Sequence, residues 1–477
     1  MRTKIIGRET EIKILESLFE SGKSELVALY GRRRVGKTYL VKSLFDNRLD
    51  FFVTGKYKGT KTDELEIFHS QLVEYSGFPY PLPMSWKDAF SQLRHYLENL
   101  HKQRILVFID EMPWLDTPRS KFVNEFESFW NGWASTRSNL MIIICGSATT
   151  WMNTKVIRQK GGLHGRCTRK IKLSQFSLYE TERFLESKNI KWNRHQIAEC
   201  YMILGGTPYY LDMLQKGWSV PQNIDFLLFR KDAELRGEYS ILMDSLFKNS
   251  KIYRQVIALL SRQSKGMTRQ EMMEACKIGD GGTFSEVLEN LINCDFIRDF
   301  SAYGKVERDT MYQLTDMFVL FYHKFLKNSG GVDEHFWSNS IDTPAHRAWS
   351  GYAFEQLCLN HISQIKRALG ITGILCNVCS WYQKKDPSKG LPGGQIDMLI
   401  ERRDQVINVC EAKYSASPYV ISAKYLNTMI DRMENFRTSS KTRSALHLTM
   451  IAASGLAENE QSGSVQSVVT LDSLFEK

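Results

Sequence analysis

A run of eight residues near the N-terminus has the composition of a phosphate-binding loop. The run is Gly31-Arg32-Arg33-Arg34-Val35-Gly36-Lys37-Thr38, and it fits G-x-x-x-x-G-K-[ST] at every position. In this pattern the glycines let backbone N–H groups surround phosphate oxygens, Lys37 neutralises the β- and γ-phosphates, and Thr38 ligates Mg²⁺. We therefore predict a site for a nucleoside triphosphate with Mg²⁺. The alternative is a chance match in a basic turn.

An acidic pair, Asp110 and Glu111, directly follows the apolar segment 105–109. Ligands of parallel sheets bind at the carboxyl ends of the strands, and this pair is expected at such an end. Asp110 is positioned to hold the Mg²⁺ ion, and Glu111 can orient and polarise a water for attack on the γ-phosphate. The alternative is an ordinary acidic pair at the end of a strand.

A second group of acids lies near the C-terminus. The apolar segments 396–400 and 406–410 are joined by a polar turn, which predicts a β-hairpin. Successive residues of a strand point to opposite faces, so Glu411 and Lys413 share one face. Asp397 lies at the start of the first strand, and Glu411 lies at the end of the second. These two positions are at the same end of the hairpin. We expect the two carboxylates and the lysine to converge.

Carboxylate oxygens are hard ligands that suit Mg²⁺ or Mn²⁺. A metal ion held by Asp397 and Glu411 would activate water and stabilise an oxyanion on phosphorus. Lys413 would position that water or neutralise charge, and Glu355, on a preceding helix, would complete the shell. The spacing D-x(13)-E-x-K is short, and a hairpin with charged ends is the alternative.

The elements that position these residues begin with an α/β region over 1–175. Apolar runs at 25–30, 51–54, 105–109 and 140–145 are separated by amphipathic stretches. Continuous apolar strands of this kind predict a parallel sheet covered on both faces. One amphipathic helix, from residue 38 to 44, follows the phosphate loop directly.

Residues 176–244 lack strand patterns and are predicted to form a small helical subdomain, with helices at 179–185 and 197–204. Residues 245–330 have the element order of a winged helix. The expected elements are helices at 251–260, 268–276 and 283–293 and a hairpin of 296–300 with 311–314. A linker from 329 to 344 then leads to a final α/β region over 345–477.

The winged helix has two interpretations. Its groove-reading helix, 283–293, carries Glu286 and Glu289 and neither Lys nor Arg, whereas phosphate contacts need cations. The wing does contain Lys305 and Arg308. Packing against protein and binding to DNA both stay open for this module.

The bulk composition sets outer limits on function. The chain has 477 residues and a formal net charge of +10, which is compatible with nucleic acid but is also a solution to solubility. We expect no membrane partner and a cytoplasmic location, since no apolar run approaches the roughly 18 residues of a membrane span. The close pair Cys376 and Cys379 is interpreted as two structural thiols on a strand, with a redox pair as the alternative.

The motifs in their order along the chain resemble the AAA+-related, STAND-like ATPases often called archaeal-type ATPases. The segments are Gly7-Arg8-Glu9, the phosphate loop, Asp110-Glu111, Gly146-Ser147, Gly165-Arg166 and Gly205-Gly206-Thr207-Pro208. The resemblance covers nearly the whole chain. It implies ATP as the nucleotide, and a homo-oligomer stays open as a partner.

The resemblance also implies roles for single residues. Gly7 and Arg8 would lie near the adenine, and Gly206 and Pro208 would form the nucleotide-facing turn of a helical lid. Ser147 would touch the γ-phosphate or the attacking water, although this position is commonly Asn in AAA+ proteins, so positioning of the water rests more on Glu111. Arg166 would respond to the γ-phosphate within its own subunit or from a neighbour. The alternative for Arg166 is a surface arginine in a basic, Gly-rich loop.

The C-terminal region resembles the PD-(D/E)XK nuclease superfamily, a domain that archaeal-type ATPases commonly carry. The leading hypothesis is an ATPase coupled to a winged-helix and nuclease-like half that acts on DNA. The alternative is a nucleotide-dependent switch in which the nuclease-like fold is a non-catalytic binding or oligomerisation module. A DNA-translocating motor is a third hypothesis.

Overall fold

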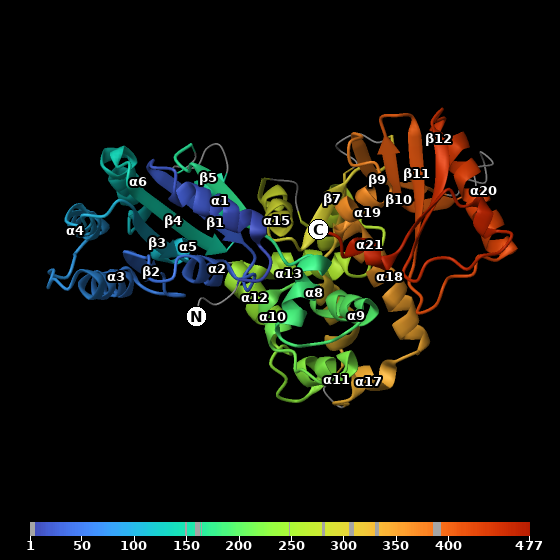
Figure 1. Ribbon diagram of the computed structural model, residues 1–477, viewed down its shortest axis with the longest axis horizontal. Helices are drawn as coiled ribbons and strands as arrows, with labels where there is room; N and C mark the ends of the chain where they lie inside the picture. The colour runs from blue at the N-terminus through green and yellow to red at the C-terminus, as the bar shows by residue number, and fades with distance from the viewer. Residues whose placement is uncertain are drawn as a thin grey trace. The chain divides into compact units, whose positions relative to one another are not determined.

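A computed structural model describes residues 5–147, 150–157, 163, 165–247, 249–278, 282–304, 310–329, 333–384 and 393–477. The chain forms two compact units (Figure 1). The first unit consists of Met1–Gln175 with Ser245–Lys248, and the second of Phe176–Asp244 with Asn249–Lys477. Because the helical, winged-helix and C-terminal regions share the second unit, their division into three domains stays a prediction.

The first unit contains a parallel β-sheet in the strand order β2–β3–β4–β1–β5. Its strands are β1 (Glu25–Gly31), β2 (Phe51–Thr54), β3 (Ile105–Asp110), β4 (Leu140–Ser147) and β5 (Arg169–Leu173). The four strands predicted from apolar runs are confirmed. The fifth strand was not predicted, because its sequence Arg-Lys-Ile-Lys-Leu lacks a continuous apolar run. It is an edge strand with alternating exposed and buried residues.

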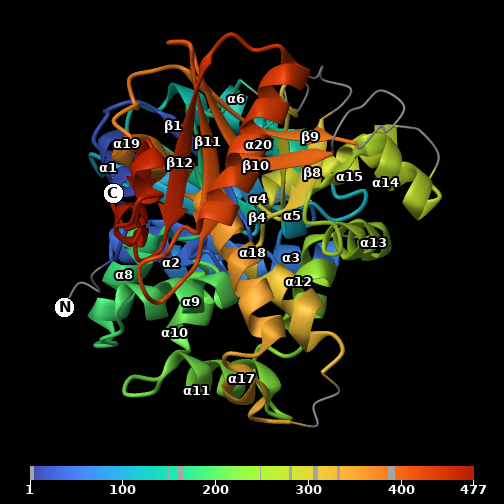
Figure 2. The same cartoon turned by 90° about the vertical axis from the view of Figure 1, so that its right-hand side faces the viewer.

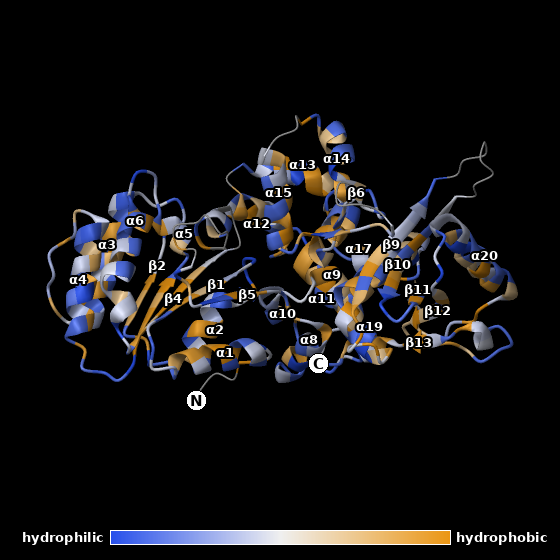
Figure 3. Ribbon diagram, turned by 90° about the horizontal axis from the view of Figure 1, so that it is seen from above, coloured by the Kyte–Doolittle hydropathy of each residue, from blue (hydrophilic) through white to orange (hydrophobic). Residues whose placement is uncertain are grey.

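Helices cover both faces of this sheet, as the apolar strands require. They are α1 (Glu9–Phe19), α2 (Lys37–Leu44), α3 (Lys61–Ser76), α4 (Trp86–Glu98), α5 (Met112–Leu115), α6 (Phe122–Gly132) and α7 (Thr150–Met152). One core joins the sheet to α1 and α2, and the other joins it to α3, α4 and α6. Figure 3 shows β2 and β4 in the hydrophobic colour, whereas α3 and α4 mix hydrophilic and hydrophobic residues.

Helices predominate after β5, in agreement with the sequence analysis. They are α8 (Leu178–Ser187), α9 (Arg194–Leu204), α10 (Pro208–Asp212), α11 (Val220–Ile224) and α12 (Glu238–Leu246). Short 3₁₀ or π turns occur at Ala134–Thr136, Asn153–Ile157, Asp225–Phe229, Tyr322–Leu326 and Ser462–Ser464.

The next elements form what we call the small-sheet module, residues 249–327. They are α13 (Ser250–Leu260), β6 (Met267–Thr268), α14 (Arg269–Cys276), α15 (Gly282–Asn293), β7 (Ile297–Phe300), β8 (Met311–Leu314) and α16 (Met317–Phe321). The predicted helices and hairpin are present, and the two-residue strand β6 extends the hairpin to an antiparallel sheet in the order β6–β8–β7. The wing residues Lys305 and Arg308 lie outside the described residues.

The prediction of a linker between residues 329 and 344 is wrong in part. The helix α17 (Phe336–Ser340) lies within it, and Trp337 of this helix is fully buried. The Asp225 carboxylate anchors the helix by accepting hydrogen bonds from the backbone N–H groups of Trp337 (2.8 Å) and Ser338 (3.1 Å). Thr343 caps the next helix, so the predicted end of the linker near Thr343 and Pro344 agrees with the start of α18.

The C-terminal region is a mixed sheet with helices, in the strand order β13–β12–β11–β10–β9. Its elements are α18 (Pro344–Asn360), α19 (Ile362–Ala368), β9 (Cys376–Gln383), β10 (Gly394–Arg402), β11 (Val406–Lys413), α20 (Ala423–Ser440), β12 (Ala445–Ala452), β13 (Ser467–Val469) and α21 (Leu471–Leu474). Strands β9, β10 and β11 pair antiparallel, and β11, β12 and β13 pair parallel.

The predicted hairpin is the pair β10–β11, and α20 lies along the sheet (Figure 2). The ring of Phe436 on α20 packs 5.5 Å from that of Trp381 on β9. Cys376 and Cys379 lie on β9 as free thiols, as the structural interpretation expects. In this arrangement Asp397 and Glu411 occupy neighbouring strands at one end of the hairpin.

Candidate functional site

The phosphate loop connects β1 to α2, so it leaves the carboxyl end of a central strand and enters the N-terminus of a helix. Gly36 precedes the helix with φ +89°, a backbone conformation that favours glycine. Lys37 is the first residue of the helix and is only 6% exposed. Its Nζ donates to the carbonyls of Gly31 (3.2 Å) and Arg32 (3.0 Å), which places the ammonium group across the loop.

Gly31 is required by packing against the neighbouring edge strand. It pairs with Leu173 of β5, and a Cβ atom at position 31 would lie 2.1 Å from the Leu173 carbonyl oxygen. Because that oxygen belongs to the backbone, it cannot move aside as a flexible side chain would. The loop therefore starts from a position that accepts only glycine without a shift of β5.

The two residues predicted to bind Mg²⁺ meet in the structure. The Thr38 hydroxyl donates a 2.6 Å hydrogen bond to Oδ2 of Asp110. Asp110 is buried at the end of β3, and its Oδ1 accepts the backbone N–H of Glu111 at 3.0 Å. Two side-chain oxygens from residues 72 positions apart thus lie within hydrogen-bond distance beside the loop.

Glu111 combines an unusual backbone conformation with a carboxylate oxygen that lacks a hydrogen-bond partner within the described structure. Its φ of +44° lies in the left-handed region, and burial raises the pKa of its carboxyl against the opposing charge of Lys37. The backbone of Ser147, at the end of β4, hydrogen-bonds this carboxylate. In the described part of the chain its buried Oε2 has no hydrogen-bond partner. A strained backbone and a spare buried oxygen are typical of residues held for a ligand or a reaction.

Arg8 forms two hydrogen bonds that could not be predicted from the sequence. Its guanidinium Nη2 donates to the carbonyl of Val35 in the phosphate loop (3.3 Å) and to that of Ser174 just after β5 (2.6 Å). Gly7 and Arg8 both have positive φ, of 69° and 63°. Arg8 therefore ties the loop to the end of the first unit, and its predicted contact with adenine stays a prediction.

The other arginines of the site differ in exposure. Arg32 is fully buried, and Arg33 lies near enough to Glu111 to lower the pKa of that carboxyl. Arg34 has a φ of +70°, in the left-handed region. Arg166 is exposed in a turn that its backbone N–H closes by donating to the Leu163 carbonyl at 3.1 Å. Its role toward the γ-phosphate stays a prediction.

The predicted lid residues belong to the second unit. The Gly206 carbonyl accepts the N–H of Phe176 at 2.7 Å, and a Cβ on Gly206 would lie 2.0 Å from the Phe176 oxygen. Pro208 is the first residue of α10. These contacts explain the glycine by packing, and the nucleotide-facing role of both residues stays a prediction.

In the C-terminal region, both carboxylate oxygens of Glu411 accept hydrogen bonds. Its Oε1 accepts from Lys413 Nζ (2.9 Å) and from the Tyr425 hydroxyl (2.5 Å), and its Oε2 accepts from Arg432 Nη1 (3.1 Å). These donors lower the pKa of the Glu411 carboxyl although burial opposes them. Tyr425 and Arg432 were missed in the sequence, where the only signal is their seven-residue spacing on one helix.

Asp397 and Glu355 share the electrostatic environment of Glu411. Burial raises the pKa of Asp397, and the negative charge of Glu411 adds to this. Burial and the charges of Asp397 and Glu411 raise the pKa of Glu355 to about 7. Among the described residues, however, no three His, Cys, Asp or Glu side chains lie close enough together to hold a metal ion. The carboxylates influence one another without forming a compact three-acid shell.

The parallel sheet with its glycine-rich loop, Lys37 and the Thr38–Asp110 contact defines a P-loop nucleoside triphosphatase. Residues 5–214 match a family described as an ATPase domain predominantly from Archaea. The chain thus carries a P-loop ATPase domain of the archaeal ATPase family, which makes ATP its nucleotide.

Two proteins of Methanocaldococcus jannaschii are similar in sequence. An uncharacterized protein is 23% identical over 398 residues, which cover 83% of each chain. An uncharacterized ATP-binding protein is 44% identical over 43 residues, which cover 9% of this chain and 73% of that protein.

Solved structures with a similar chain path include a Walker-type ATPase of Pyrococcus abyssi, with 19% identity, a TM-score of 0.49, and coverage of 68% of this chain and 97% of that one. The Aeropyrum pernix ORC2 protein in its ADPNP–ADP complexes has 15% identity and a TM-score of 0.43 over 69% and 95% of the two chains. In the described ranges, no helix of the chain is long and apolar enough to cross a membrane.

Proposed function

We propose that the chain binds ATP with Mg²⁺ at residues 31–38 and hydrolyses it, with Glu111 as the general base. The contact of 2.6 Å between Thr38 Oγ1 and Asp110 Oδ2 carries this proposal. It brings together two oxygens of the kind that Mg²⁺ takes in phosphate sites. An Mg²⁺ ion would be held there by Thr38 and Asp110 and would supply positive charge to neutralise the phosphates during hydrolysis.

The chain's own residues divide the remaining work. Lys37 neutralises the β- and γ-phosphates after its ammonium leaves the loop carbonyls. Glu111 uses its unpartnered Oε2 to orient the attacking water and accept its proton, and Ser147 positions the Glu111 carboxylate. Arg166 supplies positive charge to the γ-phosphate from its own subunit or from a neighbouring copy.

Two substitutions test this proposal. Lys37→Ala abolishes ATP binding because it removes the cation that neutralises the β- and γ-phosphates. Glu111→Gln retains ATP binding and lowers hydrolysis by at least about 100-fold, because an amide cannot accept the proton. Isothermal titration and phosphate release measure the two effects, with exposed Lys13→Ala on α1 as the control. Hydrolysis that persists in Lys37→Ala would show that this loop is not the nucleotide site.

For the C-terminal region we propose a metal-dependent site that acts on DNA, with Asp397 and Glu411 as ligands of Mg²⁺ or Mn²⁺. The observation in its favour is that these side chains lie close enough to change one another's pKa. The charges of Asp397 and Glu411 raise the pKa of Glu355, and Lys413 lowers the pKa of Glu411. A metal ion at Glu411 has to compete with Arg432 and Lys413, which already bond this carboxylate. Lys413 would then neutralise charge on the phosphate.

The alternative, a nucleotide-dependent switch with a non-catalytic C-terminal module, is favoured by the same bonded state of Glu411. Plasmid and linear DNA incubated with Mg²⁺ or Mn²⁺, with and without ATP, separate the two. Cleavage that Asp397→Ala and Lys413→Ala abolish, and that the turn variant Asp404→Asn keeps, supports the nuclease. Intact DNA under all conditions, together with slow turnover and an ATP-dependent change of oligomeric state, supports the switch.

A further inference from the structure

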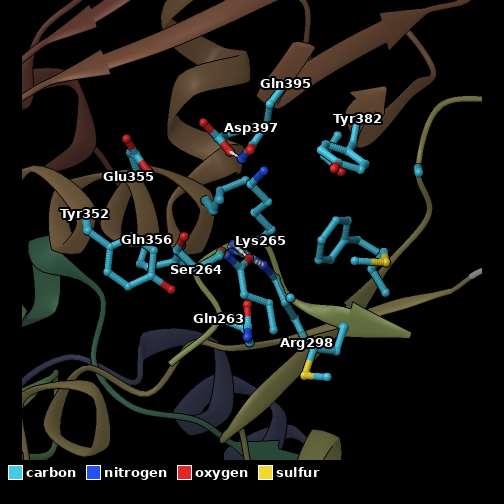
Figure 4. Close-up of a pocket in the computed structure, with 18 of the residues that line it drawn as sticks. Gln263, Ser264, Lys265, Arg298, Tyr352, Glu355, Gln356, Tyr382, Gln395 and Asp397 are labelled. Atoms are coloured by element: carbon cyan, nitrogen blue, oxygen red, sulfur yellow. Dashed lines mark hydrogen bonds between the residues drawn. The ribbon is translucent and has the colours of Figure 1, made fainter. Parts of the chain in front are cut away.

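The second unit contains a large open pocket that the proposed nucleotide site does not use. Its volume is about 1090 Å³. Figure 4 shows side chains that line it. The walls come from the loop 263–268 and strands β7 and β8 of the small-sheet module, and from α18, β9 and β10 of the C-terminal region. We call it the Arg298 pocket. Small-molecule sites have volumes of roughly 300–1,000 Å³, so a ligand of nucleotide size fits within it.

Specific contacts hold the walls of the pocket together. The Tyr303 N–H donates to the Ser380 carbonyl at 2.8 Å, next to a bridge between Ala302 and Ser380. The rings of Tyr303 and Phe436 lie 5.0 Å apart. These contacts join the small-sheet module to β9 and α20, so the two sides of the pocket are held together within this unit.

Arg298 in the pocket wall is a cation with neutral partners. Its Nε and Nη2 donate to Oε1 of Gln313, the former at 3.1 Å, and Nη2 also donates to Oε1 of Gln356 at 2.8 Å. Within the described ranges it forms no ion pair, and its buried Nη1 has no hydrogen-bond partner. Burial lowers its pKa to about 10, so it is still charged at neutral pH. A half-buried guanidinium that has neutral partners and a spare N–H donor favours an anion.

Lys265 adds a second cation on an exposed loop. Its Nζ lies 4.5 Å from the centre of the Tyr382 ring, and its charge lowers the pKa of Asp397. Figure 4 shows the Lys265 side chain extending through the middle of the pocket toward Asp397 and Gln395. Lys265 thus occupies space that a ligand would take, while Tyr382 is more than half exposed beside it.

We propose that the Arg298 pocket binds a phosphate-bearing ligand of nucleotide size, with its phosphate on Arg298 and Lys265. The amide of Gln395 and the carboxyls of Asp397 and Glu355 then face the edge of a base, which offers donors and acceptors. A free nucleotide and the unpaired end of a nucleic-acid strand present the same chemistry. The proposal depends neither on ATP hydrolysis nor on DNA cleavage, although the pocket shares Glu355 and Asp397 with the metal-dependent site proposed above.

The full-length Lys37→Ala variant tests this binding, since its phosphate loop no longer competes for the probe. The probes are AMP and a fluorescent oligothymidylate with and without a 5′-phosphate, each followed by titration and displaced with inorganic phosphate. Arg298→Gln weakens binding at least about 10-fold, because it removes a charge-assisted contact. Lys265→Ala weakens it about 3- to 10-fold, and exposed Lys424→Ala on α20 leaves it unchanged.

The probes also distinguish the sources of the ligand. Binding of AMP alone identifies a free nucleotide, and binding of the 5′-phosphorylated strand alone identifies a strand end. Failure of all probes to bind overturns the proposal, as does equal affinity in Arg298→Gln, in Lys265→Ala and in the parent variant. Because Lys265 is exposed, its variant stays informative even if Arg298→Gln unfolds. ATP hydrolysis by the unmodified loop is measured separately, so its failure is not confused with failure here.

Discussion

The phosphate loop of the first unit and the carboxylate group of the second unit use similar residues but satisfy them to different degrees. At the loop, Asp110 holds only neutral donors and Glu111 keeps a buried oxygen without a partner in the described chain. At the hairpin, both oxygens of Glu411 accept hydrogen bonds from cationic side chains. Over the residues that the structure describes, the first arrangement leaves a carboxylate oxygen without a cationic partner, and the second has cationic side chains on both oxygens.

The two sites also differ in how far apart their residues lie along the chain. Residues 31–38 are contiguous, so the strand and the helix that flank them determine their geometry. The group at Asp397 and Glu411 combines a hairpin with α18 and α20, and the partners on α20 decide its charge.

The largest expected effect is at the start of the loop. Gly31→Ala places a Cβ atom 2.1 Å from the Leu173 backbone oxygen, so β5 has to move away from β1. We expect a loss of about 3 kcal/mol in unfolding free energy, at the upper end for overpacking, together with loss of ATP binding. Thermal unfolding and titration measure both. In Gly132→Ala, where the added atom meets open space, stability is unchanged or slightly higher.

An unchanged Gly31→Ala protein would contradict the close pairing of β1 with β5. That pairing also marks a limit of sequence analysis. Strands buried on both faces, such as 105–110, are recognisable as apolar runs, whereas β5 is not because one side of it is exposed. The loop and its acidic partners could be predicted from spacing alone.

The carboxylate site could be predicted only in part. The hairpin brought Asp397, Glu411 and Lys413 to one end, as alternation along the strands requires. Tyr425 and Arg432 lie 14 and 21 positions from Glu411, and neither spacing indicates a contact before α20 is placed on the sheet. The tie of Arg8 to Ser174 spans 166 positions and was hidden for the same reason.

A smaller effect is expected at Glu355, whose pKa is raised to about 7 by burial and by Asp397 and Glu411. A raised carboxyl pKa means that the folded protein holds the proton more tightly than the unfolded chain. Stability therefore falls as pH rises from the ordinary glutamate range to about 7. Glu355→Gln stays neutral, so it becomes more stable than the parent by roughly 1–3 kcal/mol above pH 7.

Unfolding midpoints measured from pH 4.5 to 8 test this expectation, with exposed Glu460→Gln as the control for loss of one charge. A constant difference between Glu355→Gln and the parent across this range would show that neither burial nor the neighbouring carboxylates raise the pKa of Glu355. A difference that grows toward pH 7 would show that ionisation of Glu355 destabilises the fold. Glu355 would then resemble Glu111 of the loop, whose pKa is also raised by burial.

The smallest expected effect concerns the donors that distinguish Glu411 from Glu111. Tyr425→Phe removes the 2.5 Å hydrogen bond to Oε1 and leaves Lys413 and Arg432 in place. We expect a loss of about 1–2 kcal/mol at neutral pH, typical of a hydrogen bond to a charged group, and a rise in the pKa of Glu411. Because a lowered carboxyl pKa stabilises the fold only above its folded-state value, the loss shrinks as pH falls below the ordinary glutamate range.

Thermal unfolding against pH measures the loss, and Tyr382→Phe, a tyrosine that is 54% exposed on β9, is the control. Addition of Mn²⁺ extends the test to the comparison itself. If Glu411 is a ligand blocked by its donors, Tyr425→Phe gains more stability from Mn²⁺ than the parent does, since one competing donor is gone. If Mn²⁺ stabilises neither protein, the bonded Glu411 is the resting state of a binding module, and the phosphate loop is the metal site that the proposal retains.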